Sequence, residues 1–186
     1  MEDPKLNGLI DIYDIFKEIE VEMYLSAGTL LGATRDGDFI PWDWNISVCC
    51  KSEQFDQKLK RFCELLLSKD FRFKITRKGQ YICIKARKNS IVYIIENLIL
   101  INGWRTRPYN KWLDKFLNKT DYKKIQGIDF PCPYPAEKLC EWLYGENWRT
   151  PIKIGHRDDV ITKRCRILRS DKLNNKIYRT GTKKDV

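Results

Sequence analysis

Apolar residues recur at helical spacing in two stretches of the chain. One set follows Pro4 and the other follows Ser52: Leu6, Leu9, Ile10, Tyr13 and Phe16, then Phe55, Leu59, Phe62 and Leu66. This period places each set on one face of a helix. Proline is favoured in a first helical turn and serine caps helix N-termini, so we expect helices to begin at Pro4 and at Ser52.

Other stretches alternate as strands do. Phe71, Phe73 and Ile75 precede Lys78-Gly79, and Ile82 and Ile84 follow it, which predicts a hairpin. Asn102-Gly103 predicts a second hairpin, between Leu98 to Ile101 and the residues from Trp104 onward.

Further elements complete the pattern. We expect short strands at Glu22 to Ser26 and at Pro41 to Val48, and a helix that opens within Thr29 to Ala33. A last short helix is predicted to begin at Pro135 and to end at Gly145. This mixture predicts an α+β domain with a mixed β-sheet and flanking helices.

Composition indicates one folded domain. The 186 residues are 42% hydrophobic and 12% aromatic, which is enough to build a core. We assign residues 1–156 to this domain. Residues 157–186 are predicted to be a basic C-terminal extension, partly mobile, with one helix around Val160 to Leu168.

The net charge favours anionic partners. There are 35 basic and 25 acidic residues, giving +10, and such a field attracts nucleotide donors, acidic glycans, anionic lipids or nucleic acid. A basic surface that serves only solubility is the simpler interpretation. Nucleic acid is the weakest of these partners, because the basic tail has too few aromatic residues for base stacking.

The cysteine pattern and the length of the apolar runs indicate the cellular compartment. The seven cysteines are an odd number and form no CxxC pair, and His156 is the one histidine. We therefore expect reduced, buried thiols rather than disulfides or zinc ligands. No secretory signal or membrane-spanning run is visible, which predicts a cytoplasmic protein.

Candidate chemistry gathers between Leu25 and Ser47. Gly28 permits a tight turn, and the free amides of a helix opening at Thr29 would bind a phosphate. On the strand predicted next, Asp43, Asn45 and Ser47 share one face. Magnesium is held by one or two carboxylates together with substrate phosphates, and Asp43 is the one carboxylate of the three.

This segment resembles the LicD family, the phosphocholine-transferase group that includes fukutin and fukutin-related protein, within the nucleotidyltransferase-like superfamily. The residues that match the family pattern are Ser26, Gly28, Thr29, Leu30, Leu31, Gly32, Arg35, Ile40, Pro41, Trp42, Asp43 and Ile46. A second block, Pro133-Tyr134-Pro135 with Leu139, Tyr144-Gly145, Trp148 and Pro151, resembles the family's downstream signature.

The resemblance implies a nucleotidyltransferase-like fold. It also implies a phosphotransferase that moves a phosphate-linked alcohol, phosphocholine or a pentitol phosphate, from a CDP-activated donor to a glycan hydroxyl, with Mg²⁺ or Mn²⁺. The implied catalytic residues are Asp43 and Arg35, with Asp43 as metal ligand and Glu96 as its helper. The implied substrate-binding residues are Ser26, Gly28, Thr29, Trp42, Asn45 and Ser47.

The departures from the pattern keep a second hypothesis open. Asn45 and Ser47 stand where the family has carboxylates, and the loss of two charges weakens a magnesium site. The alternative is a degenerate relative that binds a nucleotide, an anionic glycan or a protein without turnover. Arg35 is equally compatible with a grip on a diphosphate and with an ordinary surface charge, and Asp36 and Asp38 are typical turn residues.

Overall fold

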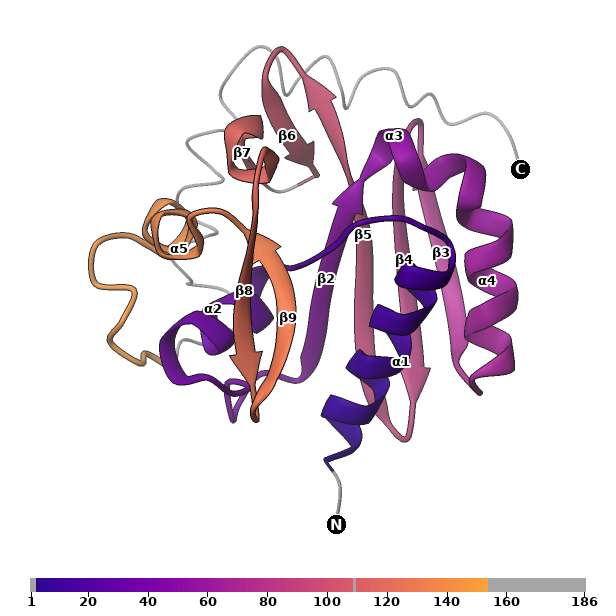
Figure 1. Ribbon diagram of the computed structural model, residues 1–186, viewed down its shortest axis with the longest axis horizontal. Coiled ribbons are helices and arrows are strands. Elements are labelled where there is room, and N and C mark those ends of the chain that lie inside the picture. The colour runs from indigo at the N-terminus through magenta and orange to yellow at the C-terminus, as the bar shows by residue number, and fades with distance from the viewer. Residues whose placement is uncertain (1–2, 109, 154–186) are drawn as a thin grey trace.

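The computed structural model describes residues 3–108 and 110–153 (Figure 1). The elements in chain order are α1 (Pro4–Glu18), β1 (Met23–Leu25), α2 (Ala27–Asp36), β2 (Asn45–Lys51), α3 (Ser52–Phe55), the 3-10 helix η1 (Asp56–Lys58), α4 (Leu59–Ser68), β3 (Arg72–Lys78), β4 (Tyr81–Lys88), β5 (Ile91–Ile101), β6 (Trp104–Arg107), β7 (Asn110–Leu113), the 3-10 helix η2 (Asp114–Leu117), β8 (Thr120–Ile125), β9 (Ile128–Pro133) and α5 (Ala136–Tyr144).

A mixed sheet is the centre of the described structure. Its strands lie in the order β1-β2-β5-β4-β3, and β6 and β7 extend it from the far end of β5. The β2–β5 pair is parallel and its register sets Ser47 beside Ile94 and Cys49 beside Glu96. The other pairs of this sheet are antiparallel. The predicted α+β class is confirmed.

Most of the expected elements form for the predicted local reasons. In α1, Asp3 caps the helix by accepting a hydrogen bond from the Lys5 amide at 2.8 Å, and proline occupies the first turn. The hairpins at Lys78-Gly79 and Asn102-Gly103 join β3 to β4 and β5 to β6. Helix α5 begins after Pro135 and ends at Gly145.

Several boundaries differ from the prediction. Helix α2 begins at Ala27, two residues before Thr29. The second strand begins at Asn45 rather than Pro41, because the Asp43 amide donates to the Ile40 carbonyl at 3.0 Å and closes a turn there. The helix expected from Ser52 is broken into α3, η1 and α4, and Lys51 takes the position of the N-cap.

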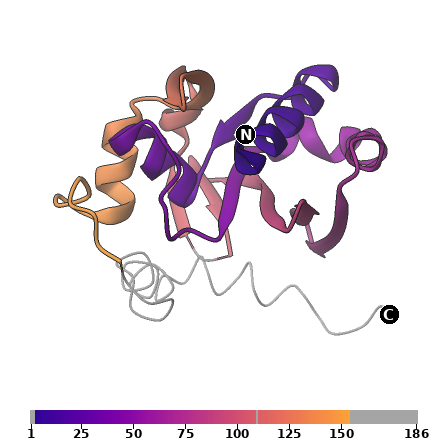
Figure 2. The same ribbon diagram turned by 90° about the horizontal axis from the view of Figure 1, so that it is seen from below.

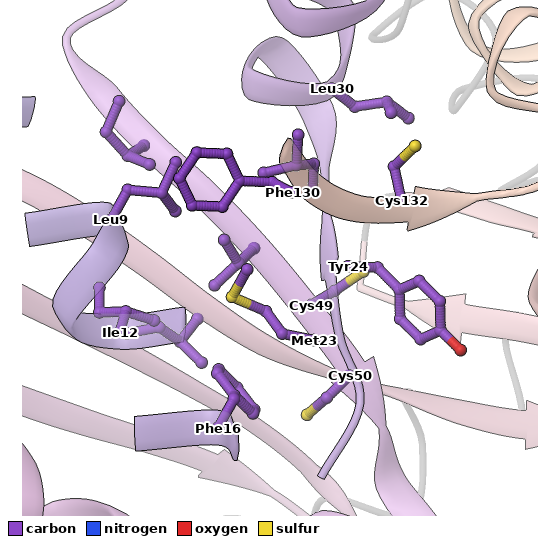
Figure 3. Packing of buried hydrophobic residues seen from close by; sticks show 14 of the residues in the cluster. Leu9, Ile12, Phe16, Met23, Tyr24, Leu30, Cys49, Cys50, Phe130 and Cys132 are labelled. Atoms are coloured by element: carbon purple, nitrogen blue, oxygen red, sulfur yellow. The ribbon is translucent and has the colours of Figure 1, made fainter. Parts of the chain in front are cut away.

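Helices α1 and α4 cover the same face of the sheet (Figures 1 and 2). A Cβ added at Gly8 of α1 would lie 2.1 Å from the Tyr93 hydroxyl of β5, so this helix packs closely on the strand. Leu9, Ile12 and Phe16 of α1 point into the core (Figure 3), where all three are fully buried.

A second layer forms beside β1. The β8–β9 hairpin contributes Phe130 and Cys132 to the same core, next to Leu30 of α2 (Figure 3). The Gln126 amide in its turn donates to the Gly37 carbonyl after α2 at 2.9 Å. The hydrophobic pattern did not predict β7, β8 or β9, because the lysine-rich sequence of β8 and the prolines of β9 hide their alternation.

The six cysteines that the structure describes are free. Four are buried, as predicted, and two, Cys63 and Cys83, are half-buried. Cys165, the proposed extension at 157–186 and the helix expected around Val160 to Leu168 lie outside the described residues. Across residues 3–108 and 110–153, no helix has the length and apolar character needed to cross a membrane.

Candidate functional site

Asp43 lies directly against the start of α2. A Cβ added at Gly28 would lie 2.0 Å from the Asp43 Oδ2 atom, so only glycine permits this approach. Gly28 lies in the first turn of α2 rather than in the predicted tight turn, and the contact brings it beside the predicted carboxylate. It places a negative charge beside the positive end of the α2 dipole.

The N-cap side chain of α2 leaves the amide groups of the first turn uncapped. Ser26 is the N-cap residue, but its hydroxyl makes no capping hydrogen bond and instead accepts one from Arg107 Nη1 at 3.1 Å. The next residue, Ala27, has a left-handed backbone with φ of 47°. Such a conformation costs about 1 kcal/mol for a residue with a Cβ. The amides of this turn are therefore available to an anion.

A ladder of hydrogen bonds connects the predicted strand residues. The Ser47 hydroxyl donates to Asn45 Oδ1 at 2.8 Å, and Asn45 Nδ2 lies 3.4 Å from Asp43 Oδ1 as a donor. The Ser47 amide donates to Thr29 Oγ1 at 2.8 Å. The Asn45 side chain therefore links the Ser47 hydroxyl to the Asp43 carboxylate.

Lys5 is a site residue that the sequence analysis missed. Its ammonium group donates to the Asp43 carbonyl at 3.0 Å, and Lys5 borders a gap, too narrow for a water molecule, together with Gly28, Thr29, Asp43 and Asn45. No local pattern marks Lys5, because it reaches the site only through the packing of α1. A wider groove, about 510 Å³ in volume, lies elsewhere, between Phe116 of η2 and Trp142 of α5.

Glu96 lies on the sheet face that carries Asn45 and Ser47, but in a buried ion pair. Arg107 Nη1 is 2.7 Å from Glu96 Oε2, and both side chains are 2% exposed. The Tyr81 hydroxyl donates to the other carboxylate oxygen. Glu96 pairs with Cys49, four residues beyond Asn45, which is about 13 Å along a strand. The structure therefore does not bring Glu96 to Asp43.

Arg35 and Trp42 occupy more distant positions. Arg35 lies in the last turn of α2, about 10 Å along the helix from Gly28. Its Nη2 atom is paired with Asp36 at 2.6 Å. Trp42 is 40% exposed in the turn before β2.

The oxygen atoms present fit a divalent cation poorly. Asp43 offers one carboxylate, Asn45 directs an amide donor toward it, and Glu96 is held by Arg107 and Tyr81. Within the described part of the chain, no three acidic, cysteine or histidine residues cluster as a metal site. Hard divalent cations depend on anionic oxygen ligands, so these residues do not fit a magnesium or manganese ion.

Residues 20–134 match the family model described as LicD/FKTN/FKRP, nucleotidyltransferase domain. The match spans more than half of the chain and includes β1, the start of α2, Asp43 and β2. This protein therefore belongs to the LicD family of nucleotidyltransferase domains, as its motif predicted, and its family and fold are of a transferase type.

Solved structures of the antibiotic-resistance factor ANT(2'')-Ia share the fold. A crystal structure in complex with adenylyl-2''-tobramycin aligns with a TM-score of 0.52 and 9% identity, covering 96% of this chain and 97% of the other. A solution structure aligns with a TM-score of 0.53 and 11% identity, covering 97% and 92%. At this identity the likeness shows the fold alone, and it confirms the predicted nucleotidyltransferase-like architecture. No curated protein sequence matches the chain.

Proposed function

We propose that this chain is a LicD-type phosphotransferase. It would move a phosphate-linked alcohol, of the phosphocholine or pentitol phosphate type, from a CDP-activated donor to a glycan hydroxyl. The observation that carries the proposal is the contact between Asp43 and Gly28, because it sets a carboxylate beside an uncapped helix N-terminus in a nucleotidyltransferase domain family.

In this proposal the donor lies on the surface beside the first turn of α2. The first-turn amides and the Lys5 ammonium bind the diphosphate, and the exposed Trp42 ring is available to stack on the cytosine. Asp43 accepts the proton of the glycan hydroxyl. The oxygen of that hydroxyl attacks the phosphorus atom that carries the choline or the pentitol. The bond from that phosphorus to the oxygen of CMP breaks, and CMP leaves. The predicted Mg²⁺ or Mn²⁺ takes no part in these steps.

Calorimetry and CMP release test the proposal together. We expect wild-type protein to bind CDP-choline, and Asp43→Asn to retain binding but to release CMP at least about a hundredfold more slowly, the usual contribution of a general base. Asp70→Asn is the matched control, because Asp70 is exposed and its left-handed backbone suits asparagine. Titrations with and without Mg²⁺ or Mn²⁺ test the predicted metal. Absence of CDP-choline binding under both conditions contradicts the proposal.

A specific observation favours a second function, ligand binding without turnover. The amide and hydroxyl at positions 45 and 47 bond to each other, and Arg107 neutralises Glu96. A domain in this state would hold a nucleotide or an anionic glycan by the same α2 amides and would lack the negative charge that metal-dependent transfer needs. Metal-independent binding of CDP-choline with no CMP release, in wild type and Asp43→Asn alike, identifies this function.

A further inference from the structure

The outer strands of the sheet carry a dense array of positive charge on one face. The register pairs Arg72 with Arg87 and Lys74 with Lys85 across β3 and β4. Like charges directly opposite on neighbouring strands repel each other. Lys78, four residues after Lys74, points to the same side because side chains alternate along a strand. We call Arg72, Lys74, Lys78, Lys85 and Arg87 the cationic face.

Among residues 3–108 and 110–153, this face lacks the counter-ions that the opposite face has. All five of its cations are exposed, and none forms an ion pair with a residue of the described ranges. On the helix-covered side of the same strands, Lys88 pairs with Asp11 at 2.8 Å and Arg77 pairs with Asp56. A surface patch of uncompensated positive charge raises the local concentration of anions, so this face favours an anionic partner.

The cationic face continues the candidate site. Across the sheet, Lys74 and Lys85 share a row with Ile94 and Ser47, and Arg72 and Arg87 share a row with Val92 and Asn45. Strands β2 and β4 are two spacings apart, about 10 Å. A ligand bound at Asp43 and an anion on β3 and β4 would therefore be neighbours on one surface.

An exposed aromatic ring lies between the two regions. Trp44 is 46% exposed, and the Lys85 ammonium lies 5.4 Å from its ring centroid. Proteins that bind single-stranded nucleic acid stack successive bases on several aromatic side chains, whereas the cationic face itself has only lysine and arginine. One apolar platform beside a charge array suits a sugar chain that carries acidic groups.

We propose that the cationic face binds an acidic glycan and holds it as the acceptor beside the donor at Asp43. The identification of this glycan as acceptor rests on the proposed function, whereas its binding to β3 and β4 does not.

Binding of defined oligosaccharides to the full chain tests the inference. We expect hexagalacturonate to bind at low salt at least tenfold more tightly than the neutral maltohexaose, with affinity that falls as salt rises. The double variant Lys74→Glu/Lys85→Glu should lose at least tenfold in hexagalacturonate affinity. The control is Lys58→Glu/Lys60→Glu at two exposed lysines near the start of α4, which changes the net charge equally and should bind as wild type.

Three outcomes overturn the inference: equal binding of the two hexasaccharides, equal loss in the two double variants, or tighter binding of a uridine hexanucleotide than of hexagalacturonate. The last outcome would assign the face to nucleic acid.

CDP-choline affinity, measured on the same variants, separates this inference from the proposed function. We expect it to be unchanged in Lys74→Glu/Lys85→Glu, and its absence in wild type would contradict the proposed function alone. Thermal melting of each variant confirms that it is folded.

Discussion

At the scale of single residues, Gly28 decides whether Asp43 reaches the helix. In Gly28→Ala, the new Cβ would overlap the Asp43 carboxylate, so the carboxylate must move away from the first turn. We expect CDP-choline affinity to fall at least tenfold and the free energy of unfolding to fall by about 1–3 kcal/mol. Calorimetry and urea unfolding measure the two effects.

The control for Gly28→Ala is Gly79→Ala in the β3–β4 turn. A Cβ there meets no atom within 4 Å, but φ is +58°, so the variant should lose about 1 kcal/mol of stability and keep its nucleotide affinity. Unchanged affinity in Gly28→Ala would show that Asp43 and the first turn of α2 do not form the ligand site.

The buried pair of Glu96 and Arg107 makes a second residue-scale prediction. Glu96→Gln removes the Glu96 carboxylate from the buried guanidinium of Arg107, and breaking such a pair costs about 3–5 kcal/mol. Urea unfolding should show this loss. The double variant Glu96→Gln/Arg107→Met should recover part of it, because it also removes the buried positive charge. A stability of Glu96→Gln within 1 kcal/mol of wild type would contradict the buried pair.

At the scale of elements, Asp11 anchors α1 to its neighbours. The carboxylate accepts hydrogen bonds from Lys69 at 3.0 Å and from Lys88 at 2.8 Å. Burial by itself would raise the pKa of Asp11, but the two lysines outweigh it and lower that pKa. A carboxyl group with a lowered folded pKa stabilises the fold above its unfolded pKa, and this contribution disappears as the pH falls through the folded value.

Asp11→Asn should therefore be less stable than wild type at pH 7 by about 1 kcal/mol, a modest amount because solvent screens the partly exposed pair. The difference should shrink as the pH falls below 4, since protonation removes the wild-type advantage. Asp14→Asn, at an exposed pair with Lys17, is the control with little effect. A difference that stays constant with pH would exclude the ion pairs as its cause.

Reversal of one charge in the β3–β4 hairpin should raise the free energy of unfolding. In Lys74→Glu, a repulsive pair with Lys85 becomes an attractive one across the strands, so the free energy of unfolding should rise by about 0.5 kcal/mol. Thermal melting at low salt measures this gain, which high salt should remove. A lower melting temperature at low salt would show that Lys74 has a structural partner.

At the scale of the whole molecule, thiol reactivity reports whether the fold opens as one unit. Burial raises the pKa of Cys49 and of Cys140 to about 12, and the thiolate is the reactive form. In a Cys165→Ser background, we expect Cys63 and Cys83 to react with a disulfide reagent in the native state. The four buried thiols should react only with global unfolding. Fast reaction of Cys132 or Cys140 would show that the β8–β9 and α5 layer opens locally.

Much of the architecture could be predicted from the sequence, because its causes are local. Pro4, the Asn102-Gly103 turn, and Pro135 with Gly145 each fix backbone geometry within a few residues. The family motif likewise marked Gly28 and Asp43, which are adjacent in space. Strands β7, β8 and β9 were missed because tertiary contacts override their weak alternation.

The sequence by itself determined the family, the α+β class and the loss of two carboxylates at Asn45 and Ser47, since these depend on residue identity and short-range spacing. Only the tertiary structure decided the charge state around the site. The fold holds Glu96 away from the candidate site in an ion pair with Arg107, and it brings Lys5 of α1 to that site. The register also aligns four cations across β3 and β4. Electrostatic interactions depend on distance in space, and strand register sets that distance between residues far apart in the chain.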